Sequence, residues 1–198
     1  METIKINLKK ITKNEIDLII GYLKRGKIIV YPTDTIYGLG CLATNRKAIN
    51  RIFKIKGRER RKPLLILVNG FKMLKKYCFV SKEQEKYLAK IWKSARPASV
   101  ILRKKGNLPA ELTAGGETIA VRLPKVKFLI KILNEANKPI VSTSLNLSGQ
   151  KSLDSVSRLD NYFKKRKPDL IIDAGVMKAK PSRLIDVRDL KNIVILRR

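Results

Sequence analysis

The sequence contains no histidine, and this absence removes several kinds of chemistry at once. Histidine is the usual general base near neutral pH, the central member of Ser-His-Asp triads and a common zinc ligand. Any reaction carried out by these 198 residues must therefore use lysine, arginine, carboxylates, hydroxyl groups or a bound metal ion.

Cysteines and long apolar runs are also scarce. The two cysteines, Cys41 and Cys78, have the spacing of neither a metal site nor a redox motif, so we interpret both as small packing residues. No apolar run approaches the roughly 18 residues of a membrane span. The amino-terminal segment METIKINLKK is too polar for a signal peptide. These absences predict a soluble, cytoplasmic protein.

Acidic residues are few, because 16 Asp and Glu stand against 45 Lys and Arg, which gives a formal net charge of +29. Clustered cations favour polyanionic partners, since they release counterions from phosphate backbones. A biased genome composition would also enrich lysine, and the cations are spread along the whole chain. The net charge alone therefore leaves a nucleic-acid partner and a compositional bias equally open.

Hydrophobic residues make up 44% of the chain, enough for one core, and we expect a single domain over residues 1–198. Short apolar runs predict strands, and amphipathic segments between some of them predict helices. Their alternation, with two hairpin-like stretches, indicates an α/β fold with a mixed sheet. The predicted strands are 27–31, 64–68, 99–103, 118–124, 139–144, 169–173, 183–187 and 192–197, and the predicted helices are 13–25, 45–56, one opening at Ser81, 126–136 and 155–166.

The segment PTDTIYGLG (32–40) is predicted to be a loop after a buried strand, where open α/β sheets commonly place ligands. It offers two threonine hydroxyls, the carboxylate of Asp34 and a phenol. Gly38 and Gly40 would let the backbone come close to another group. The structural alternative is an ordinary turn in which Asp34 binds local amides.

A second polar cluster, TSLNLSG (143–149), follows another predicted strand. Its hydroxyls and amides could bind phosphate oxygens or complete a Mg²⁺ shell. The same residues would also suit a capped helix start, which is itself an anion site. Arg122 lies inside the apolar strand TIAVRLP, so its guanidinium needs a carboxylate or phosphate partner from the protein or from a ligand.

The run KIKGRERRKPLLILV (54–68) places six cations and one acid, Glu59, in nine residues and then becomes apolar. The cations could form a solvated surface, contact a nucleic-acid backbone or line a pocket for a small anion. Lys56 and Arg58 stand at the end of a predicted helix, where compensation of the helix dipole is their structural alternative.

Five motifs in this order resemble the YrdC-like family of threonylcarbamoyl-AMP synthases, in its single-domain, TsaC-type branch. The resemblance implies a twisted open α/β sheet with helices packed on it and a basic concave cavity. The motifs are YPTDTIYGLG (31–40), KIKGR with KPLLILV (54–68), TIAVRLP (118–124), STSLNLSG (142–149) and PSRLIDV (181–187).

The same resemblance implies a nucleotidyltransferase that joins L-threonine, bicarbonate or CO₂, and ATP with its Mg²⁺. The products would be threonylcarbamoyl-AMP and pyrophosphate. A separate threonylcarbamoyl-transferase complex would then use the first product to modify adenosine 37 of tRNA. Direct tRNA contact and the oligomeric state stay open from the sequence.

The resemblance also implies roles for individual residues, and none of them is a protein ligand of a metal. Lys56 and Arg58 would be catalytic, because the attack of a carbamate on the α-phosphorus needs positive charge. The threonine ligands would be Thr35, Arg122, Ser142 and Ser182. The nucleotide would be surrounded by Lys56, Arg58, Lys62, Thr118, Ser144, Asn146 and Ser152. No general base is identifiable, and solvent or Asp34 could take the proton.

The chain departs from the family pattern at several positions near these motifs. Glu59 stands where proline is common, Lys62 where asparagine is common, and Leu67 where many members carry a histidine. Arg183 replaces the threonine of a Pro-Ser-Thr motif, and ARPASV (95–100) replaces WPGPLT. These changes leave room for an alternative, a non-catalytic RNA-binding or ribosome-maturation module of the same fold. The low aromatic content of 6% speaks against base stacking by such a module.

Overall fold

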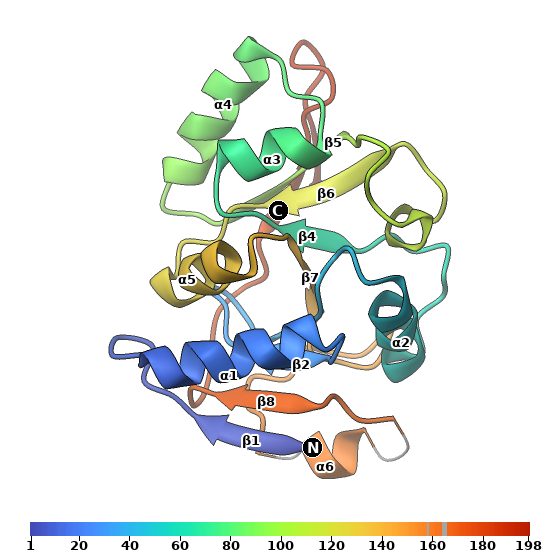
Figure 1. Ribbon diagram of the computed structural model, residues 1–198. Coiled ribbons are helices and arrows are strands. Elements are labelled where there is room, and N and C mark those ends of the chain that lie inside the picture. Colours follow the sequence, from blue (N-terminus) through green and yellow to red (C-terminus); the bar gives the residue numbers. More distant parts are fainter. Residues whose placement is uncertain (158, 164–165) are drawn as a thin grey trace.

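The computed structural model describes residues 1–157, 159–163 and 166–198. The strands in these residues are β1 (Glu2–Lys5), β2 (Ile29–Tyr31), β3 (Gly38–Gly40), β4 (Leu65–Leu67), β5 (Ala98–Arg103), β6 (Thr118–Arg122), β7 (Ile140–Ser144), β8 (Leu170–Asp173), β9 (Arg183–Asp186) and β10 (Val194–Arg197). They form one sheet in the order β1-β8-β2-β3-β7-β4-β6-β5-β9-β10 (Figure 1). Because β5 pairs antiparallel with β6 and parallel with β9, the predicted mixed sheet is confirmed.

Helices connect many of these strands. They are α1 (Lys13–Lys24), α2 (Arg46–Lys56), α3 (Phe71–Tyr77), α4 (Lys82–Lys93), the 3₁₀ helix η1 (Ala110–Thr113), α5 (Lys127–Ala136) and α6 (Leu159–Tyr162). Thr12 and Glu15 form a capping box at the start of α1, and Ser81 with Gln84 forms another at the start of α4. Each box satisfies two amides that a helix start leaves without partners. The predicted boundaries of α1, α2 and α5 agree with the structure to within two residues.

Two hydrophobic cores lie on the two faces of the sheet. Successive strand residues point to opposite faces, and in β2 Val30 belongs to one core whereas Ile29 and Tyr31 belong to the other. The first core includes the apolar faces of α2, α3 and α4. The second includes those of α1 and α5, which pack side by side (Figure 1). Each fully buried aliphatic side chain contributes about 1.5–3 kcal/mol.

The prediction of a loop over 32–40 is wrong at its carboxyl end, since Gly38–Gly40 is strand β3. This strand lies between β2 and β7 and pairs antiparallel with both. Glycines have no side chain that favours a strand, so the sequence pattern gave no strand signal there. The glycines are used for packing instead, because the ring of Tyr31 lies against the positions where Cβ atoms would stand on Gly38 and Gly40.

The prediction of a helix over 155–166 is also wrong in extent. Within the described residues only Leu159–Tyr162 is helical, and residues 158, 164 and 165 lie outside that description. The hydroxyls of Ser155 and Ser157 are 3.1 Å apart, and the Ser155 hydroxyl accepts from the Ser157 amide. Such local hydrogen bonds compete with the helical ones and delay the start of the helix.

Cys41 and Cys78 are buried and free, which confirms their interpretation as packing residues. Burial raises the pKa of the Cys78 thiol to about 12, so it stays protonated and unreactive near neutral pH. Burial raises the pKa of Cys41 as well.

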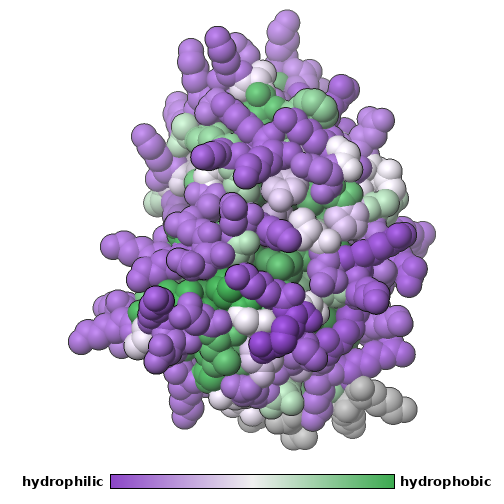
Figure 2. Space-filling view, in the orientation of Figure 1, coloured by the Kyte–Doolittle hydropathy of each residue, from purple (hydrophilic) through white to green (hydrophobic). Residues whose placement is uncertain are grey.

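The surface is rich in polar groups. Figure 2 shows one face that is covered mainly by hydrophilic residues, with hydrophobic residues visible in smaller areas between them. In the part of the chain that the structure describes, no helix combines the length and the apolar character that crossing a membrane requires.

The close packing at Gly40 leads to a test of the fold. A Cβ atom there would lie 2.0 Å from the Val141 carbonyl oxygen. Gly40→Ala should therefore push β3 from β7 and lower the free energy of unfolding by about 3 kcal/mol or more, as chemical denaturation would measure. Gly106→Ala is the control, because nothing lies within 4 Å of its Cβ position. Equal stability of the two variants would contradict this packing.

Candidate functional site

A cavity of about 470 Å³ opens on the face of the sheet that also carries α1 and α5. Strand register explains why its lining comes together, because Leu65 of β4 pairs with Ala120 of β6, and Ala120 pairs with Ile101 of β5. Paired residues in neighbouring strands point to the same face, and all three line the cavity. The other lining groups include the hydroxyls of Thr33, Thr35, Thr118, Ser142, Ser144, Ser152 and Ser182 and the guanidinium groups of Arg58, Arg122 and Arg197. Among its described lining residues there is no Asp or Glu.

The structure brings most of the predicted site residues to this one cavity. The lining residues among them are Thr35, Arg58, Thr118, Arg122, Ser142, Ser144, Ser152 and Ser182. Lys56, Lys62 and Asn146 are not part of the lining. Residues from five motifs that are distant in sequence therefore meet at one surface, which the resemblance required.

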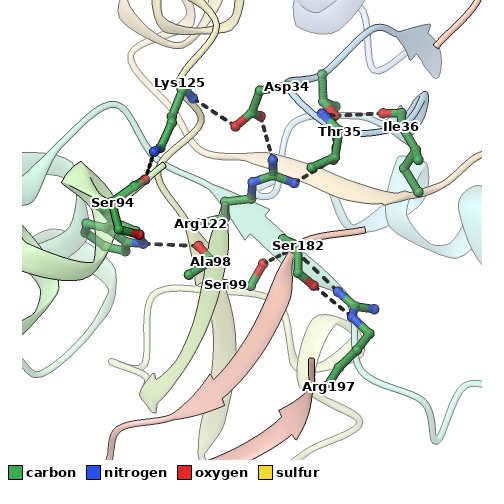
Figure 3. A network of polar contacts seen from close by, with 12 residues as sticks. Asp34, Thr35, Ile36, Ser94, Ala98, Ser99, Arg122, Lys125, Ser182 and Arg197 are labelled. Atoms are coloured by element: carbon green, nitrogen blue, oxygen red, sulfur yellow. Dashed lines mark hydrogen bonds and ion pairs between the residues drawn. The ribbon is translucent and has the colours of Figure 1, made fainter. Parts of the chain in front are cut away.

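Arg122 lies at the centre of the polar network in the cavity and is only 6% exposed. Its Nη2 donates to Asp34 Oδ1 at 2.6 Å, and its Nη1 donates to Thr35 Oγ1 at 3.0 Å (Figure 3). The buried Nε has no hydrogen-bond partner. The partner expected for this guanidinium is thus a protein carboxylate, and one of its three nitrogens has no partner.

The Asp34 side chain binds Arg122 and not the amides of its own turn. Its Oδ1 accepts from Arg122, and its Oδ2 accepts from the backbone amide of Lys125 at 3.3 Å (Figure 3). The alternative in which Asp34 binds local amides is therefore wrong. Asp34 does not belong to the described lining of the cavity, so its position gives no support to a role as general base.

Ser182 is held by two further residues that the sequence analysis did not select. Its hydroxyl lies 2.8 Å from the hydroxyl of the buried Ser99, and its carbonyl accepts from Arg197 Nε at 2.9 Å (Figure 3). Burial and then the charge of Arg122 lower the pKa of Arg197. A single cation at the end of the apolar run NIVILR was the only sequence signal for Arg197, and it resembles an ordinary exposed strand end.

Lys56 is 1% exposed and lies behind the cavity wall. Its Nζ donates to the carbonyl of Ser144 at 2.5 Å, and to the carbonyl and side-chain oxygens of Asn146 at 2.8 and 2.7 Å. Burial, and then the charge of Arg58, lower the pKa of Lys56 to about 7. The three acceptors oppose this shift, because only an ammonium group has a proton for each of them. Lys56 therefore joins α2 to the loop after β7, and its place in the last turn of α2 is also compatible with compensation of the helix dipole.

The loop after β7 is ordered around Asn146. Its Oδ1 accepts from Lys56 and, at 2.6 Å, from the hydroxyl of Ser144, while its Nδ2 donates to the carbonyl of Gln150 at 2.5 Å. Residues 145–150 form bends and a turn, so the alternative of a capped helix start in this motif is wrong. The oxygens of Ser144 and Asn146 bind the buried ammonium of Lys56 instead of capping a helix.

The basic run after α2 divides into residues with different surroundings. Arg58 lines the cavity, and it donates from Nε to the Lys62 carbonyl at 3.1 Å and from Nη2 to the Pro63 carbonyl at 2.9 Å. Burial lowers the pKa of Arg58. The Lys62 ammonium is exposed and pairs with Glu59 at 2.8 Å. Lys54, Arg60 and Arg61 are exposed as well, so Arg58 is the member of this run that reaches the cavity.

The positions that depart from the family pattern are explained in part. Leu67 is 1% exposed and belongs to the core beneath α1 and α5. Arg183 stands outside the described cavity lining, and its Nη2 lies 3.5 Å from the hydroxyl of Ser94. Its buried Nε has no hydrogen-bond partner.

The ion pair of Arg122 and Asp34 can be tested through stability. Both side chains are nearly buried, with 8% and 12% exposure. Asp34→Ala leaves a buried cation without its partner and should lower the free energy of unfolding by about 3 kcal/mol in chemical denaturation. Glu59→Ala removes an exposed pair and is the control, for which we expect little change. A small effect of Asp34→Ala would show that Arg122 does not depend on this carboxylate.

The lowered pKa of Lys56 predicts how stability changes with pH. Between about pH 7 and the ordinary pKa of 10.5, the unfolded chain binds more protons than the folded one. The stability of the wild type relative to Lys56→Met should therefore rise with pH across this window, by at most about 1.4 kcal/mol per pH unit. Denaturation at several pH values measures the difference. A flat line for Lys56→Met would contradict the shift.

Comparison with known proteins agrees with this geometry. Threonylcarbamoyl-AMP synthase of Pyrococcus abyssi is 34% identical over 175 residues, which are 87% of this chain and 51% of that protein. This chain thus spans about half the length of that relative. Threonylcarbamoyl-AMP synthase of Pseudoalteromonas translucida is 35% identical over 73% of this chain and 78% of its own.

A solved structure and a family match extend this similarity. The crystal structure of Pyrococcus abyssi Sua5 complexed with L-threonine superposes with a TM-score of 0.87 at 31% identity, over 99% of this chain and 56% of that one. Residues 21–198 match the family Sua5_yciO_yrdC, described as telomere recombination. The chain belongs to this Sua5/YciO/YrdC family.

Proposed function

We propose that this chain is a threonylcarbamoyl-AMP synthase. It condenses L-threonine, bicarbonate or CO₂, and ATP to threonylcarbamoyl-AMP and pyrophosphate, which makes it a nucleotidyltransferase. The names of its relatives support this activity. The observation that carries the proposal is the cavity itself, where a buried arginine with a free donor stands among hydroxyls and two further arginines.

The threonine half of the site would be built around Arg122. A guanidinium binds a carboxylate strongly, and Arg122 lines the cavity, where its charge would attract the carboxylate of threonine. Thr35, Ser142 and Ser182 line the same cavity and would complete the contacts. Binding of L-threonine to the related Sua5 structure supports this assignment.

The nucleotide half would use Arg58 and Arg197, with the hydroxyls of Thr118, Ser144 and Ser152 around it. At a separation of about 4 Å a unit charge pair gains about 1 kcal/mol in water and about 4 kcal/mol near a protein surface. Two arginines at a half-enclosed cavity can therefore offset much of the repulsion between a carbamate and a triphosphate. In this assignment Arg58 is the catalytic cation.

The other predicted nucleotide residues would act from outside the cavity lining. Lys56 has committed its three protons to Ser144 and Asn146, so we assign it to holding the nucleotide loop in place. Asn146 belongs to the same arrangement. Lys62 would have to leave its exposed pair with Glu59 to reach a phosphate.

The chemistry has two steps. The neutral amine of threonine adds to the carbon of CO₂, or of bicarbonate with loss of water, and releases a proton. An oxygen of the resulting carbamate then attacks the α-phosphorus, and the bond to the β-phosphate breaks with departure of pyrophosphate. The cavity residues hold both reactants and offset the growing negative charge.

Mg²⁺ would arrive with ATP instead of being bound by a protein carboxylate. In the described residues no group of three or more His, Cys, Asp or Glu could hold a metal ion. The hydroxyls of Ser144 and Ser152 are neutral oxygen donors that fit the outer side of a phosphate-bound Mg²⁺. The ion would supply further positive charge to the phosphates.

The wider role follows from the product. A carbamoyl adenylate is an activated mixed anhydride, and a separate transferase complex would use it to modify adenosine 37 of tRNA in the cytoplasm. Contact of this chain with tRNA is part of the same proposal and draws on the net charge of +29. Residues 1–198 would act as one catalytic domain, which the continuous sheet supports.

The alternative, a non-catalytic RNA-binding module, is not favoured. Its support was the net charge and the departures from the family motifs, whereas the relatives are named for the synthase activity. The cavity is also lined by separate hydroxyl and guanidinium groups of the kind that small anionic substrates require.

The decisive experiment measures pyrophosphate release from ATP by the purified protein. Release should require both L-threonine and bicarbonate, and mass spectrometry should identify threonylcarbamoyl-AMP. Arg58→Ala should reduce the rate by about 100-fold, the loss typical of one charge-stabilising group. Arg61→Ala, in the same loop but outside the described cavity lining, is the matched control with an unchanged rate. Release that is independent of either substrate would refute the synthase proposal.

A further inference from the structure

The turn before β3 contains a hydroxyl pair whose proton directions can be assigned. Thr33 and Thr35 are 5% and 3% exposed, and their Oγ1 atoms are 3.0 Å apart. Thr33 Oγ1 also lies 2.7 Å from the carbonyl oxygen of Ile36 and 3.0 Å from the amide nitrogen of Thr35. Each of these neighbours has a fixed role, because a carbonyl accepts and an amide N–H donates.

The single hydroxyl proton of Thr33 therefore goes to the Ile36 carbonyl. If it pointed to Thr35 instead, two oxygens without a proton between them would face each other at 2.7 Å. With this proton committed, the contact between the two hydroxyls requires Thr35 to be the donor. Thr33 Oγ1 then accepts from both the amide and the hydroxyl of Thr35, and its two lone pairs are filled.

The other side of the Thr35 hydroxyl is fixed by Arg122. A guanidinium can only donate, so one lone pair of Thr35 Oγ1 accepts from Arg122 Nη1 at 3.0 Å. One lone pair is left, and Thr35 lines the cavity. The hydroxyl of Thr35 can thus offer the cavity an acceptor and no donor.

We infer that Thr33 is a positioning residue that fixes the Thr35 hydroxyl as an acceptor and so sets the orientation of the amino-acid substrate. A carboxylate cannot bind at Thr35, because both partners would be acceptors. The amine of the substrate can bind there, while the charge of Arg122, which lines the same cavity, attracts its carboxylate. This inference rests on the proposed function and adds to it which end of threonine faces which residue.

The consequence for the reaction is a fixed direction of the amine. A group that donates one N–H to Thr35 keeps its nitrogen at a defined place next to the bound carboxylate. Once a proton has been lost, the lone pair of that nitrogen must point away from Thr35. CO₂ or bicarbonate would approach the nitrogen from the side away from Thr35. The fixed orientation of the amine would lower the entropic cost of reaching a reactive geometry.

The test compares L-threonine with 3-hydroxybutyrate, which is threonine without its amine. Thr33→Val keeps the shape of the side chain but removes its hydroxyl, so the Thr35 hydroxyl can rotate and donate. We expect the KM for L-threonine to rise about tenfold, as for loss of a hydrogen bond to a charged group, with the KM for ATP unchanged. The preference for L-threonine over 3-hydroxybutyrate, measured by competitive inhibition, should fall by a similar factor.

Matched variants separate positioning from damage to the fold. Thr33→Ser keeps the hydroxyl and should behave as the wild type. Because Thr33 acts through Thr35, the double variant Thr33→Val/Thr35→Val should lose no more preference than Thr35→Val alone. If Thr33→Val does not fold by circular dichroism, Thr33→Cys, with its weak thiol donor and acceptor, replaces it with the same expected direction.

The outcomes distinguish this inference from the proposed function. If the wild type releases no pyrophosphate with L-threonine, the proposed function fails and the inference fails with it. If the wild type is active but Thr33→Val leaves the preference unchanged, the inference alone is overturned. Equal losses in Thr33→Ser and Thr33→Val, or additive losses in the double variant, would overturn it as well.

Discussion

The buried guanidinium of Arg122 is the constraint on which the site depends. A cation in the middle of a sheet face is costly unless a carboxylate and further acceptors surround it. Asp34 and Thr35 meet this need, and in doing so they tie the turn after β2 to strand β6. The same requirement leaves one donor, the Nε, without a protein partner. Because Arg122 also lines the cavity, its charge favours an anionic ligand there.

The buried ammonium of Lys56 also needs acceptors, but here the protein supplies one for every proton. Its ammonium finds three acceptors in the loop after β7, so all of its protons are used within the protein. Arg58, two residues later, follows the left-handed Gly57, which ends α2 and turns the chain towards the cavity. Two neighbouring cations of one motif therefore have different tasks, one inside the wall and one at its surface.

Only part of this arrangement can be predicted from the sequence, because some residues belong to a hydrophobic pattern and others do not. Apolar periodicity predicted most strands and helices, because it reflects burial directly. Strand β1 and the glycine strand β3 were missed, since the first is polar and exposed and the second has no side chains to pattern. The burial of Lys56 could not be predicted either, because a lysine at a helix end usually lies in solvent, and its acceptors come from a loop about 90 residues away.

The net charge and the chemistry of the site are largely separate matters. Of 45 Lys and Arg residues, the cavity lining contains Arg58, Arg122 and Arg197. Exposed cations are screened over about 8–10 Å in physiological salt, so they affect long-range attraction more than a bound substrate. The few arginines in the cavity act at short range and at lower dielectric, where each charge counts several-fold more. A chain with far fewer surface cations could therefore keep this site, and most of the charge of +29 lies outside the cavity lining.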